Sequence, residues 1–389
     1  MHVLLLPSWY STADKPWRGA YFADQARALN RHGLRAGIAF VERRSLSRLT
    51  PASIIASHFQ VTSSDEDRVP TLRMKGWSTF AQTNAGAMLW VELTRRLVRA
   101  YVAEHGVPDV IHGHAAMWGG HAAMLCARDL GRPFVVTEHA SSILNLDIAR
   151  ANRPRVAAIY RNAARVVAVS DALKASVDCV AGREVAEVVP NAIDTRSFRV
   201  PPSPRSTRPF VFLAVGDLVP AKRADMLIRA FARVHANAPE TQLVIAGGGG
   251  GKQRLQDLAD SLGVRDFVEL TGALTRAEVR QRMWQSNALV VSSDFETFGV
   301  VLVEALSTGI PAIATRCGGP EEIITPDLGT LVDCGDESAL ASAMTSIIGR
   351  SFDSSHLHEA VARSYGYEEV AQKLCTIYES AASRRRAVA

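Results

Sequence analysis

Residues 288–306 read ALVVSSDFETFGVVLVEAL. Four apolar residues come first, a polar turn ending at Gly299 follows, and an apolar segment that can continue as a helix comes last. This order predicts a buried strand that leads through a tight turn into a helix. The backbone N–H groups near Gly299 would then be free at the helix N-terminus, where an anion such as a diphosphate is favoured.

Two carboxylates, Glu296 and Glu304, lie on either side of that glycine. Glu296 falls in the predicted turn and Glu304 about one helical turn inside the helix, so both side chains can face one ligand. Ionised carboxylates accept hydrogen bonds from the vicinal hydroxyls of a ribose or a hexose. The alternative is structural, with Glu296 favoured by the helix dipole and Glu304 as an exposed helical residue.

Short apolar runs bounded by turn residues alternate with amphipathic stretches along the rest of the chain. The alternation predicts parallel sheets covered by helices on both faces, which is the doubly wound α/β arrangement. The predicted strands are residues 2–6, 36–41, 109–112, 133–137, 165–169, 187–189, 210–215, 242–246, 267–270, 288–292 and 311–314. Residues 43–85 are more polar and irregular, and surface loops are expected there.

Residues 200–209 contain four prolines and separate two such series of strands. Proline lacks the N–H that a helix or a central strand needs, so this segment predicts a linker between two domains. A length of 389 residues also favours two cores. We expect one Rossmann-like domain in residues 1–199 and a second in 200–366, facing each other across a cleft. A final helix in 367–389 is expected to pack back on the first domain.

The composition is that of a folded protein, with 47% apolar and 21% charged residues. The net charge of +5 favours anionic ligands or an anionic membrane surface, but it is too small for a nucleic-acid-binding protein. Five cysteines without a C-x-x-C pair predict neither a disulfide framework nor a zinc site. With no recognisable leader and no apolar stretch of membrane-spanning length, a cytoplasmic location is expected.

Further candidates follow other predicted strands. Lys222 and Arg223 come soon after strand 210–215, where their charges can meet phosphate, although such residues in loops are often only solvated. Gly318 and Gly319 follow strand 311–314 and would let the backbone approach a ligand closely, or would simply form a turn. Neither half begins with the glycine fingerprint of a dinucleotide fold, which disfavours an NAD-dependent dehydrogenase.

These pieces occur in the order in which they occur in glycosyltransferase family 4, and the chain resembles that family of retaining enzymes with the GT-B fold. The matching segments of the second half are VPNAID at 189–194, VGxLVPxK at 215–222, LVIAG at 243–247, VELTG at 268–272, the E-x7-E pair at 296 and 304, and GGPEEI at 318–323. The first half resembles a subgroup of the family with an opening P-S-W-Y motif, through PSWY at 7–10, Pro16, Gly19, Phe22, Gln25, Ala26 and Leu29.

The resemblance implies roles for individual residues on the donor side. Lys222 would bind the donor diphosphate, Glu296 would contact the donor sugar as a catalytic residue, and Glu304 would bind the nucleotide ribose. Many relatives carry a second diphosphate-binding arginine where this chain has Asp217, and Arg223 is the candidate to replace it. Backbone amides between the two glutamates would meet sugar and phosphate, at Phe298, Gly299 and Val300.

On the other side, the resemblance places Gly19 in a loop near the donor phosphate and acceptor, and His139 beside the reacting sugar. A histidine there could bind phosphate or sugar hydroxyls, whereas a histidine satisfied within its own loop is the structural alternative. His112 and His114 have the spacing of a metal pair, but no cysteine or carboxylate partner stands at ligand spacing. A strand-end loop lining the acceptor side is favoured over a metal site.

The expected function is therefore retaining transfer of a sugar from a UDP- or GDP-sugar to an acceptor, a glycolipid or surface-polysaccharide precursor, with no cofactor. Helix N-termini and Lys222 would stabilise the departing diphosphate without a metal. A sugar-nucleotide epimerase of similar shape, or a non-catalytic binder of nucleotide sugars, are the alternatives. Peripheral contact with anionic lipid at the inner face of the membrane is a further hypothesis, and it rests on basic residues of the first half: Arg43, Arg44, Arg48, Arg73, Lys75, Arg95, Arg96 and Arg99.

Overall fold

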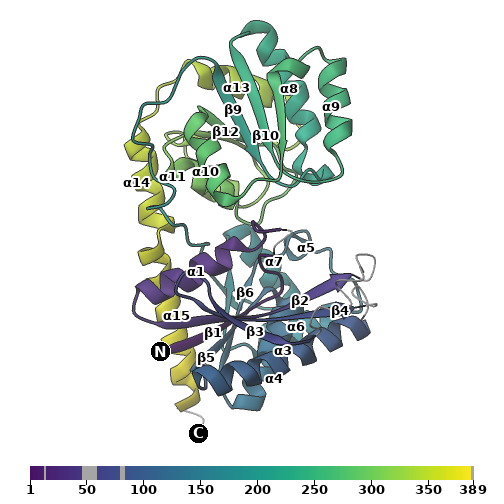
Figure 1. The fold of residues 1–389 in the computed structure, drawn as a ribbon, viewed down its shortest axis with the longest axis vertical. Helices are drawn as coiled ribbons and strands as arrows, with labels where there is room; N and C mark the ends of the chain where they lie inside the picture. Colours follow the sequence, from purple (N-terminus) through teal and green to yellow (C-terminus); the bar gives the residue numbers. More distant parts are fainter. Residues whose placement is uncertain (13–14, 46–58, 79–83, 387–389) are drawn as a thin grey trace. The chain divides into compact units, whose positions relative to one another are not determined.

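The computed structural model describes residues 1–12, 15–45, 59–78 and 84–386. The chain divides into two compact units (Figure 1). Unit 1 consists of Met1–Ala192 together with Tyr367–Ala389, and unit 2 consists of Ile193–Gly366. The boundary therefore comes earlier than the expected 199/200, and the C-terminal segment belongs to the first unit.

Unit 1 is built on a sheet whose described strands follow the order β3-β4-β2-β1-β5-β6-β7-β8. Neighbouring strands are parallel except for β3 and β4. The strands are β1 (His2–Pro7), β2 (Arg35–Ser45), β3 (Val61–Asp65), β4 (Pro70–Ser78), β5 (Val110–His114), β6 (Phe134–Glu138), β7 (Arg165–Ala168) and β8 (Ala186–Val188). The chain runs from β1 outward to β2 and returns on the other side of β1 as β5. The strand order therefore reverses between β1 and β5, which is where doubly wound sheets bind ligands at their carboxyl ends.

The helices of unit 1 cover this sheet, and α1 and α15 pack side by side (Figure 1). Val370, Leu374 and Tyr378 recur at helical spacing on α15 and are buried with Phe22 and Leu29 of α1 in one apolar core. The helical segments are α1 (Ala20–Arg31), α3 (Asn84–His105), a π-helical turn (Ala115–Gly120), α4 (His121–Leu130), α5 (Ser141–Leu144), α6 (Arg153–Asn162), α7 (Asp171–Ala181) and α15 (Tyr367–Arg386).

Unit 2 is built on a second sheet, in the order β11-β10-β9-β12-β13-β14, with all neighbours parallel. The strands are β9 (Phe210–Val215), β10 (Thr241–Ala246), β11 (Val268–Gly272), β12 (Ala288–Val291), β13 (Ala312–Thr315) and β14 (Gly329–Val332). The strand order reverses between β9 and β12, so the residues after these two strands occupy the expected ligand position of this unit. The helices are α8 (Ala224–Asn237), α9 (Lys252–Ser261), α10 (Arg276–Gln285), α11 (Val300–Ser307), α12 (Pro320–Ile323), α13 (Glu337–Ile348) and α14 (Ser354–Tyr365), with 3-10 turns at Pro220–Lys222 and Arg265–Phe267.

The expectation of surface loops throughout residues 43–85 is wrong for the part that the structure describes. β2 continues to Ser45, β4 pairs with it in parallel, and β3 adds an antiparallel strand at the edge. All five residues of β3, VTSSD, are exposed. An edge strand exposed on both faces carries no apolar alternation, so the pattern that reveals buried strands is missing there. Residues 46–58 and 79–83 lie outside the described residues.

The proline-rich segment 200–209 is part of unit 2 and does not separate the two units. Arg205 donates to the carbonyl oxygen of Gly309 at 3.1 Å and also contacts that of Thr308. Asn287 donates from Nδ2 to the carbonyl oxygen of Ser206 at 2.8 Å. Proline content predicted correctly that the segment is neither helix nor strand, but long-range hydrogen bonds attach it to the second core.

Candidate active site

In unit 2, a small pocket opens where the strand order reverses between β9 and β12. Its lining includes Gly216, Asp217, Lys222, Ser293 and Glu296. These residues follow the carboxyl ends of the two strands, as the doubly wound arrangement requires. The structure thus brings Lys222 together with Glu296, two residues that the motifs predicted to act on one ligand.

Lys222 and Glu296 form a direct ion pair, with Nζ 2.5 Å from Oε1. Ser293 donates from Oγ to the same carboxylate oxygen at 2.8 Å. The Lys222 side chain remains 33% exposed and that of Glu296 15% exposed. An ammonium group that is partly open to solvent and lies at a pocket can take an anionic ligand by changing partners.

The loop that carries Glu296 is held by the glycine pair that follows β13. Glu296 N donates to the carbonyl oxygen of Cys317, and Gly319 N donates to that of Glu296, each at 2.9 Å. A Cβ on Gly319 would stand 2.3 Å from the carbonyl oxygen of Phe298. The close backbone approach predicted for these glycines is therefore made to the protein's own loop at Phe298.

Gly299 turns the chain into α11. Its φ of +96° is left-handed, a conformation that favours glycine, and a Cβ there would also meet the end of the Leu302 side chain at 2.9 Å. The Phe298 side chain is buried with its ring 5.5 Å from that of Tyr365. Only the backbone of Phe298 is therefore suited to face a ligand, together with the N–H groups of the first turn of α11, beginning at Val300.

Glu304 has a cationic partner that the sequence motifs did not indicate. Arg276, the first residue of α10, contacts Glu304 Oε1 through Nη2 at 2.9 Å and through Nε at 3.1 Å. The same guanidinium stacks over the Phe198 ring at 4.9 Å. Glu304 is 8% exposed, so it is not the exposed helical residue of the structural alternative. No sequence signal identifies Arg276, because it belongs to no matching segment and lies 28 residues from its partner.

Arg223 lies at the start of α8 in a left-handed conformation. Its guanidinium contacts Asp294 at 3.1 Å and Asp225 at 3.7 Å. Asp217 is exposed at the rim of the pocket. Arg223 can therefore reach a phosphate only by giving up carboxylate partners, and its role as a substitute for the missing arginine remains a prediction.

In unit 1, the Glu138 carboxylate holds together the segments that follow β5 and β6 by accepting hydrogen bonds from them. It is fully buried. Its carboxylate accepts hydrogen bonds from Tyr160 Oη at 2.7 Å and from the backbone N–H groups of Ala116, His139 and Ala140 at 2.8–2.9 Å. Four donors satisfy a buried carboxylate and fix the backbone that presents His139. Sequence reasoning missed this residue because its role comes from contacts with three separate segments.

His139 is 6% exposed, and its Nε2 lies 3.0 Å from Nδ1 of His114. Burial lowers the pKa of His139 to about 3. Burial and the two neighbouring histidines also lower the pKa of His114 well below its usual range. Both rings are therefore neutral at pH 7, and one of the two contacting nitrogens donates to the other. A neutral His139 suits hydrogen bonding to a hydroxyl better than pairing with a phosphate.

The expectation of a strand-end loop at His112 and His114 is wrong, because the strand predicted over 109–112 continues to His114. Their place on the acceptor side stays a prediction. Both belong to β5 and are fully buried. His112 joins α15 to the sheet, with Nδ1 2.7 Å from Tyr378 Oη and Nε2 2.7 Å from Thr137 Oγ1. The sequence predicted this strand only as far as His112, because Gly113 and His114 do not continue an apolar run. Hydrogen bonds make the two buried histidines tolerable in the core.

Gly19 stands immediately before α1 with a φ of +68°. A Cβ at this position would lie 2.9 Å from the Phe22 ring and 3.1 Å from the carbonyl oxygen of Trp9. The glycine therefore allows the loop after β1 to turn tightly against Trp9 and enter α1. Phe22 in turn packs against His139 with ring centroids 5.1 Å apart.

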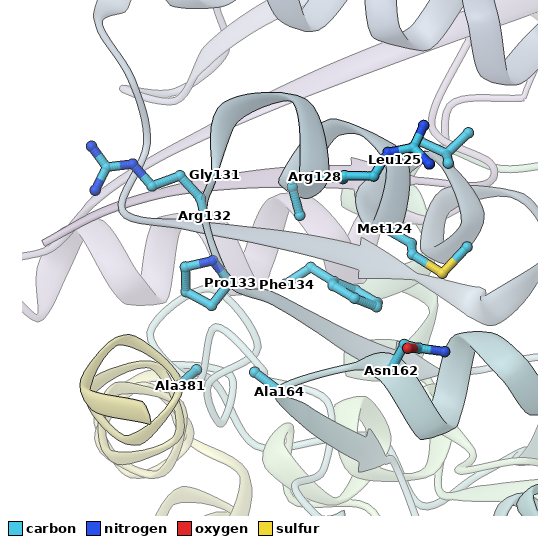
Figure 2. A pocket seen from close by; sticks show the side chains of 11 residues that line it. Met124, Leu125, Arg128, Gly131, Arg132, Pro133, Phe134, Asn162, Ala164 and Ala381 are labelled. Carbon is cyan, nitrogen blue, oxygen red and sulfur yellow. The ribbon is translucent and has the colours of Figure 1, made fainter. Parts of the chain in front are cut away.

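A larger pocket of about 730 Å³ lies in unit 1 at the end of the sheet opposite to Glu138 and His139. Figure 2 shows Phe134 of β6, Ala164 before β7 and Ala381 of α15 among its lining residues. Phe134 and Ala164 are at the amino ends of β6 and β7. Ligands of doubly wound sheets bind at the carboxyl ends, and the lining contains none of the predicted site residues.

The basic residues proposed for membrane contact are partly neutralised. Arg73 binds Glu66 at 2.7 Å, Arg95 binds Asp129 at 2.6 Å, and Arg99 binds Glu92 at 3.3 Å. Arg48 and the side chain of Arg44 lie outside the described residues. Among the described helices, none is long and apolar enough to cross a membrane. Within the same residues, no group of three His, Cys, Asp or Glu side chains is placed to hold a metal ion.

Comparison with known proteins gives the family. Residues 19–197 match the family model described as Glycosyltransferase Family 4, and residues 196–363 match the one described as Glycosyl transferases group 1. The D-inositol 3-phosphate glycosyltransferase of Thermobispora bispora is 30% identical over 312 residues, which cover 72% of this chain and 72% of that protein. This chain is a member of glycosyltransferase family 4.

Other relatives of this family 4 member are subunits of a lipid-modifying enzyme. The phosphatidylinositol N-acetylglucosaminyltransferase gpi3 subunit of Schizosaccharomyces pombe is 28% identical over 289 residues, 71% of this chain and 62% of that one. The matching chain of the Arabidopsis thaliana enzyme is 27% identical over 281 residues, 70% of this chain and 62% of the Arabidopsis chain. The chain thus spans a little under two thirds of the length of these relatives.

Solved structures show the fold. Sucrose-phosphate synthase from Thermosynechococcus elongatus has a TM-score of 0.79 at 19% identity, with 99% of this chain and 100% of that chain covered. The Anabaena protein HepE, in complex with UDP and glucose, has a TM-score of 0.74 at 19% identity, covering 98% and 100%. The family 4 member has the GT-B fold of these glycosyltransferases.

Proposed function

We propose that this family 4 member transfers a sugar from a nucleoside diphosphate sugar to a hydroxyl group of an acceptor, with retention of the anomeric configuration. The observation that carries the proposal is the Lys222–Glu296 pair, 2.5 Å apart beside the pocket at the β9/β12 reversal. A diphosphate in this position meets the ammonium group and the N–H groups at the start of α11, both of which favour negative charge.

Donor binding would separate Lys222 from Glu296 and leave the pair of Arg276 and Glu304 in place. Lys222 now neutralises Glu296, and Arg276 neutralises Glu304. When the diphosphate takes the Lys222 ammonium group, the Glu296 carboxylate is released to accept hydrogen bonds from sugar hydroxyls. Glu304 remains oriented by Arg276 and is a suitable acceptor for the ribose hydroxyls.

The chemical step needs stabilisation of the leaving diphosphate. As the bond to the sugar breaks, negative charge grows on the diphosphate, and preorganised donors aimed at that charge lower the barrier. Lys222 and the first turn of α11 supply such donors. Removal of one donor of this kind lowers a rate by about 10²- to 10³-fold. His139, neutral at pH 7, would hold a hydroxyl of the transferred sugar.

The substrate classes are part of the proposal. HepE, which has this fold, is described in complex with UDP and glucose, and we propose a UDP- or GDP-sugar as donor. Relatives are named for inositol 3-phosphate and for phosphatidylinositol as acceptors. We propose a glycan or lipid-linked acceptor, a precursor of a glycolipid or surface polysaccharide, used by a cytoplasmic enzyme in peripheral contact with the inner face of the membrane.

Calorimetric titration with UDP, GDP and ADP tests the donor site. We expect the intact chain to bind one of them, with the dissociation constant raised at least about tenfold by Lys222→Met and by Glu304→Gln, since each removes a charge-assisted contact. Lys252→Met is the matched control, because Lys252 is exposed at the start of α9. Absence of binding to all three nucleotides in the wild-type chain would contradict the proposal.

Product analysis tests the reaction. The chain should transfer the sugar of the bound nucleotide to an acceptor with the same anomeric configuration, read by NMR couplings, and should do so in the presence of EDTA. Conversion of the nucleotide sugar to an epimer without acceptor would instead identify the epimerase alternative.

A further inference from the structure

The position of the Lys222 ammonium group depends on a short turn between β9 and α8. Among the described residues that line the pocket at the β9/β12 reversal, Lys222 is the only cation, so its place decides how a diphosphate is held there. Lys222 ends the 3-10 turn Pro220–Lys222, and α8 begins two residues later at Ala224. The contacts that fix this turn therefore also place the ammonium group.

The backbone of this turn is in an unfavourable conformation at the residue after Lys222. Arg223 joins the 3-10 turn to α8 with a φ of +49° and a ψ of +38°, in the left-handed region that favours glycine. A residue with a Cβ stays in that region only where the surrounding structure holds it. The conformation that presents Lys222 must therefore be held by contacts with other parts of unit 2.

Ser292, the first residue after β12, makes such a contact. Its Oγ lies 2.9 Å from the carbonyl oxygen of Lys222 and 3.2 Å from that of Arg223, and it donates to both. The Ser292 side chain is buried. Because a hydroxyl group has one proton, the two carbonyl oxygens share it. Ser292 thus binds the backbone of the residue that carries the ammonium group and of the left-handed residue that follows it.

Other contacts of the turn are of a different kind. Asp294 N donates to the carbonyl oxygen of Ala221 at 2.8 Å, a backbone bond that every residue except proline can make at position 294. The Arg223 guanidinium reaches the exposed Asp294 carboxylate at 3.1 Å, and both groups are charged. The Ser292 bond, in contrast, is made by an uncharged side chain, so one substitution removes it without changing the charge of the site.

The two serines after β12 contact opposite members of the ion pair. Ser293 donates from Oγ to Glu296 Oε1 at 2.8 Å, and Lys222 Nζ contacts the same oxygen. Ser292 contacts the backbone of Lys222 instead. Consecutive side chains of one strand end therefore hold the ammonium group from one side and the carboxylate from the other.

We propose that Ser292 is a positioning residue for the donor diphosphate, because its hydroxyl group holds the turn that places the Lys222 ammonium group at the pocket. The inference rests on the donor role proposed for Lys222. Removal of the hydroxyl group leaves the Lys222 carbonyl oxygen without this donor and lets the turn relax. Diphosphate affinity then falls through the displaced ammonium group, although Ser292 itself does not touch the donor.

A double-mutant cycle on the full-length chain tests whether Ser292 acts through Lys222. In calorimetric titration, Ser292→Ala should raise the dissociation constant of the bound nucleoside diphosphate about fivefold, the size of effect expected from one lost hydrogen bond. In the Lys222→Met background, the same substitution should change the dissociation constant less than about twofold. An equal increase in both backgrounds would overturn the inference, since it would not depend on the ammonium group.

Three further variants control this cycle. Ser292→Thr keeps the hydroxyl group and should bind the nucleotide within about twofold of the wild type. Ser286→Ala is the matched control, because Ser286 is also buried in unit 2 and donates from Oγ to the carbonyl oxygen of Arg282 at 2.7 Å. An equal loss of affinity in Ser286→Ala would overturn the inference. If Ser292→Ala does not fold, Ser292→Cys takes its place, since a thiol is a weaker donor and should also raise the dissociation constant.

The reactivity of the Lys222 amine tests the positioning without a nucleotide. The chain is acetylated with an N-hydroxysuccinimide ester, and peptide mass spectrometry follows each lysine. In Ser292→Ala the ion pair with Glu296 loosens, so Lys222 should react at least about twofold faster than in the wild type, while the exposed Lys252 reacts at the same rate. If the wild-type chain binds no nucleotide, the donor proposal fails. If it binds one and Lys222 reacts equally in both chains, this inference alone is overturned.

Discussion

Gly319 holds the donor-side loop because no side chain separates its backbone from that of Phe298. In Gly319→Ala the new Cβ would lie 2.3 Å from the Phe298 carbonyl oxygen, so the loop at Glu296 must shift. We expect the free energy of unfolding of unit 2 to fall by about 1–3 kcal/mol, the usual cost of overpacking. Nucleotide affinity should fall as well. Urea unfolding and calorimetric titration measure the two effects.

Gly349→Ala is the matched control for this prediction. Gly349 follows α13 in the same unit, has a φ of −91°, and a Cβ there would meet no atom within 4 Å. Its unfolding free energy should stay within about 0.5 kcal/mol of the wild type. Equal effects of the two substitutions would show that close approach at Phe298 is not the cause.

The buried histidines predict a pH dependence of stability. Burial lowers the pKa of both His112 and His139 to about 3 in the folded chain, whereas an unfolded histidine titrates near 6.5. Between these values the unfolded chain binds protons that the folded chain does not. The free energy of unfolding should therefore fall as pH drops from 6.5 towards 3, by up to about 1.4 kcal/mol per pH unit for each histidine.

His112→Gln tests this cause. Its unfolding free energy should decrease less steeply between pH 6.5 and 5, by up to about 1.4 kcal/mol per pH unit. Urea unfolding followed by tryptophan fluorescence measures it, because every tryptophan except Trp284 lies in unit 1. An unchanged slope would mean that His112 is not neutral in the folded chain or titrates normally there.

Among the secondary-structure elements, α15 makes the most informative long-range contact. It packs on α1 through Val370, Leu374 and Ile377, and its Tyr378 hydroxyl reaches His112 in β5. Apolar burial and hydrogen bonding therefore both attach this helix to unit 1. The apolar contribution should be the larger one, because a net hydrogen bond adds only about 0.5–1.5 kcal/mol.

Two substitutions on α15 compare these contributions. Leu374→Ala removes a buried side chain and should lower the unfolding free energy of unit 1 by about 2–5 kcal/mol. Tyr378→Phe removes only the hydroxyl and should cost about 1 kcal/mol. Lys373→Ala, on the exposed face of the same helix, controls for helix propensity. Urea midpoints at pH 7.5 give the order, and a larger loss in Tyr378→Phe than in Leu374→Ala would contradict it.

The division of the chain into two units predicts how fragments behave. Unit 2 is continuous, from Ile193 to Gly366, and has its own apolar core. We expect residues 193–366 to fold cooperatively and to bind the same nucleoside diphosphate as the intact chain. Circular dichroism and calorimetry test this expectation, and an unfolded fragment would show that the second core depends on the first.

Unit 1 is discontinuous and should behave differently. Residues 1–192 alone lack α15, which leaves the buried face of α1 around Phe22 and Leu29 uncovered. We expect this fragment to aggregate and to become monomeric when residues 367–389 are joined to it by a flexible linker. Size-exclusion chromatography distinguishes the two states, and a monomeric, folded 1–192 fragment would contradict the role given to α15.

The fold class was predictable from the chain because its parallel strands are buried on both faces. β1, β6 and β12 are fully buried, so each appears as a short apolar run between turn residues. The turn at Gly299 was also predictable from the sequence. Its left-handed conformation favours glycine, and the glycine stands between an apolar run that forms a strand and a segment that forms a helix. Strand β3 could not be predicted in this way, because all its residues are exposed and no apolar pattern marks it.

Tertiary structure alone decided which side chains meet. Arg276 and Glu304 are 28 residues apart, and His114 and His139 are 25 apart, yet both pairs are in contact. The carboxyl ends of neighbouring parallel strands lie at one edge of a sheet, so residues distant in sequence converge there. A motif records the spacing of residues along the chain, and burial and charge pairing depend on distances in space, which only the packed sheets determine.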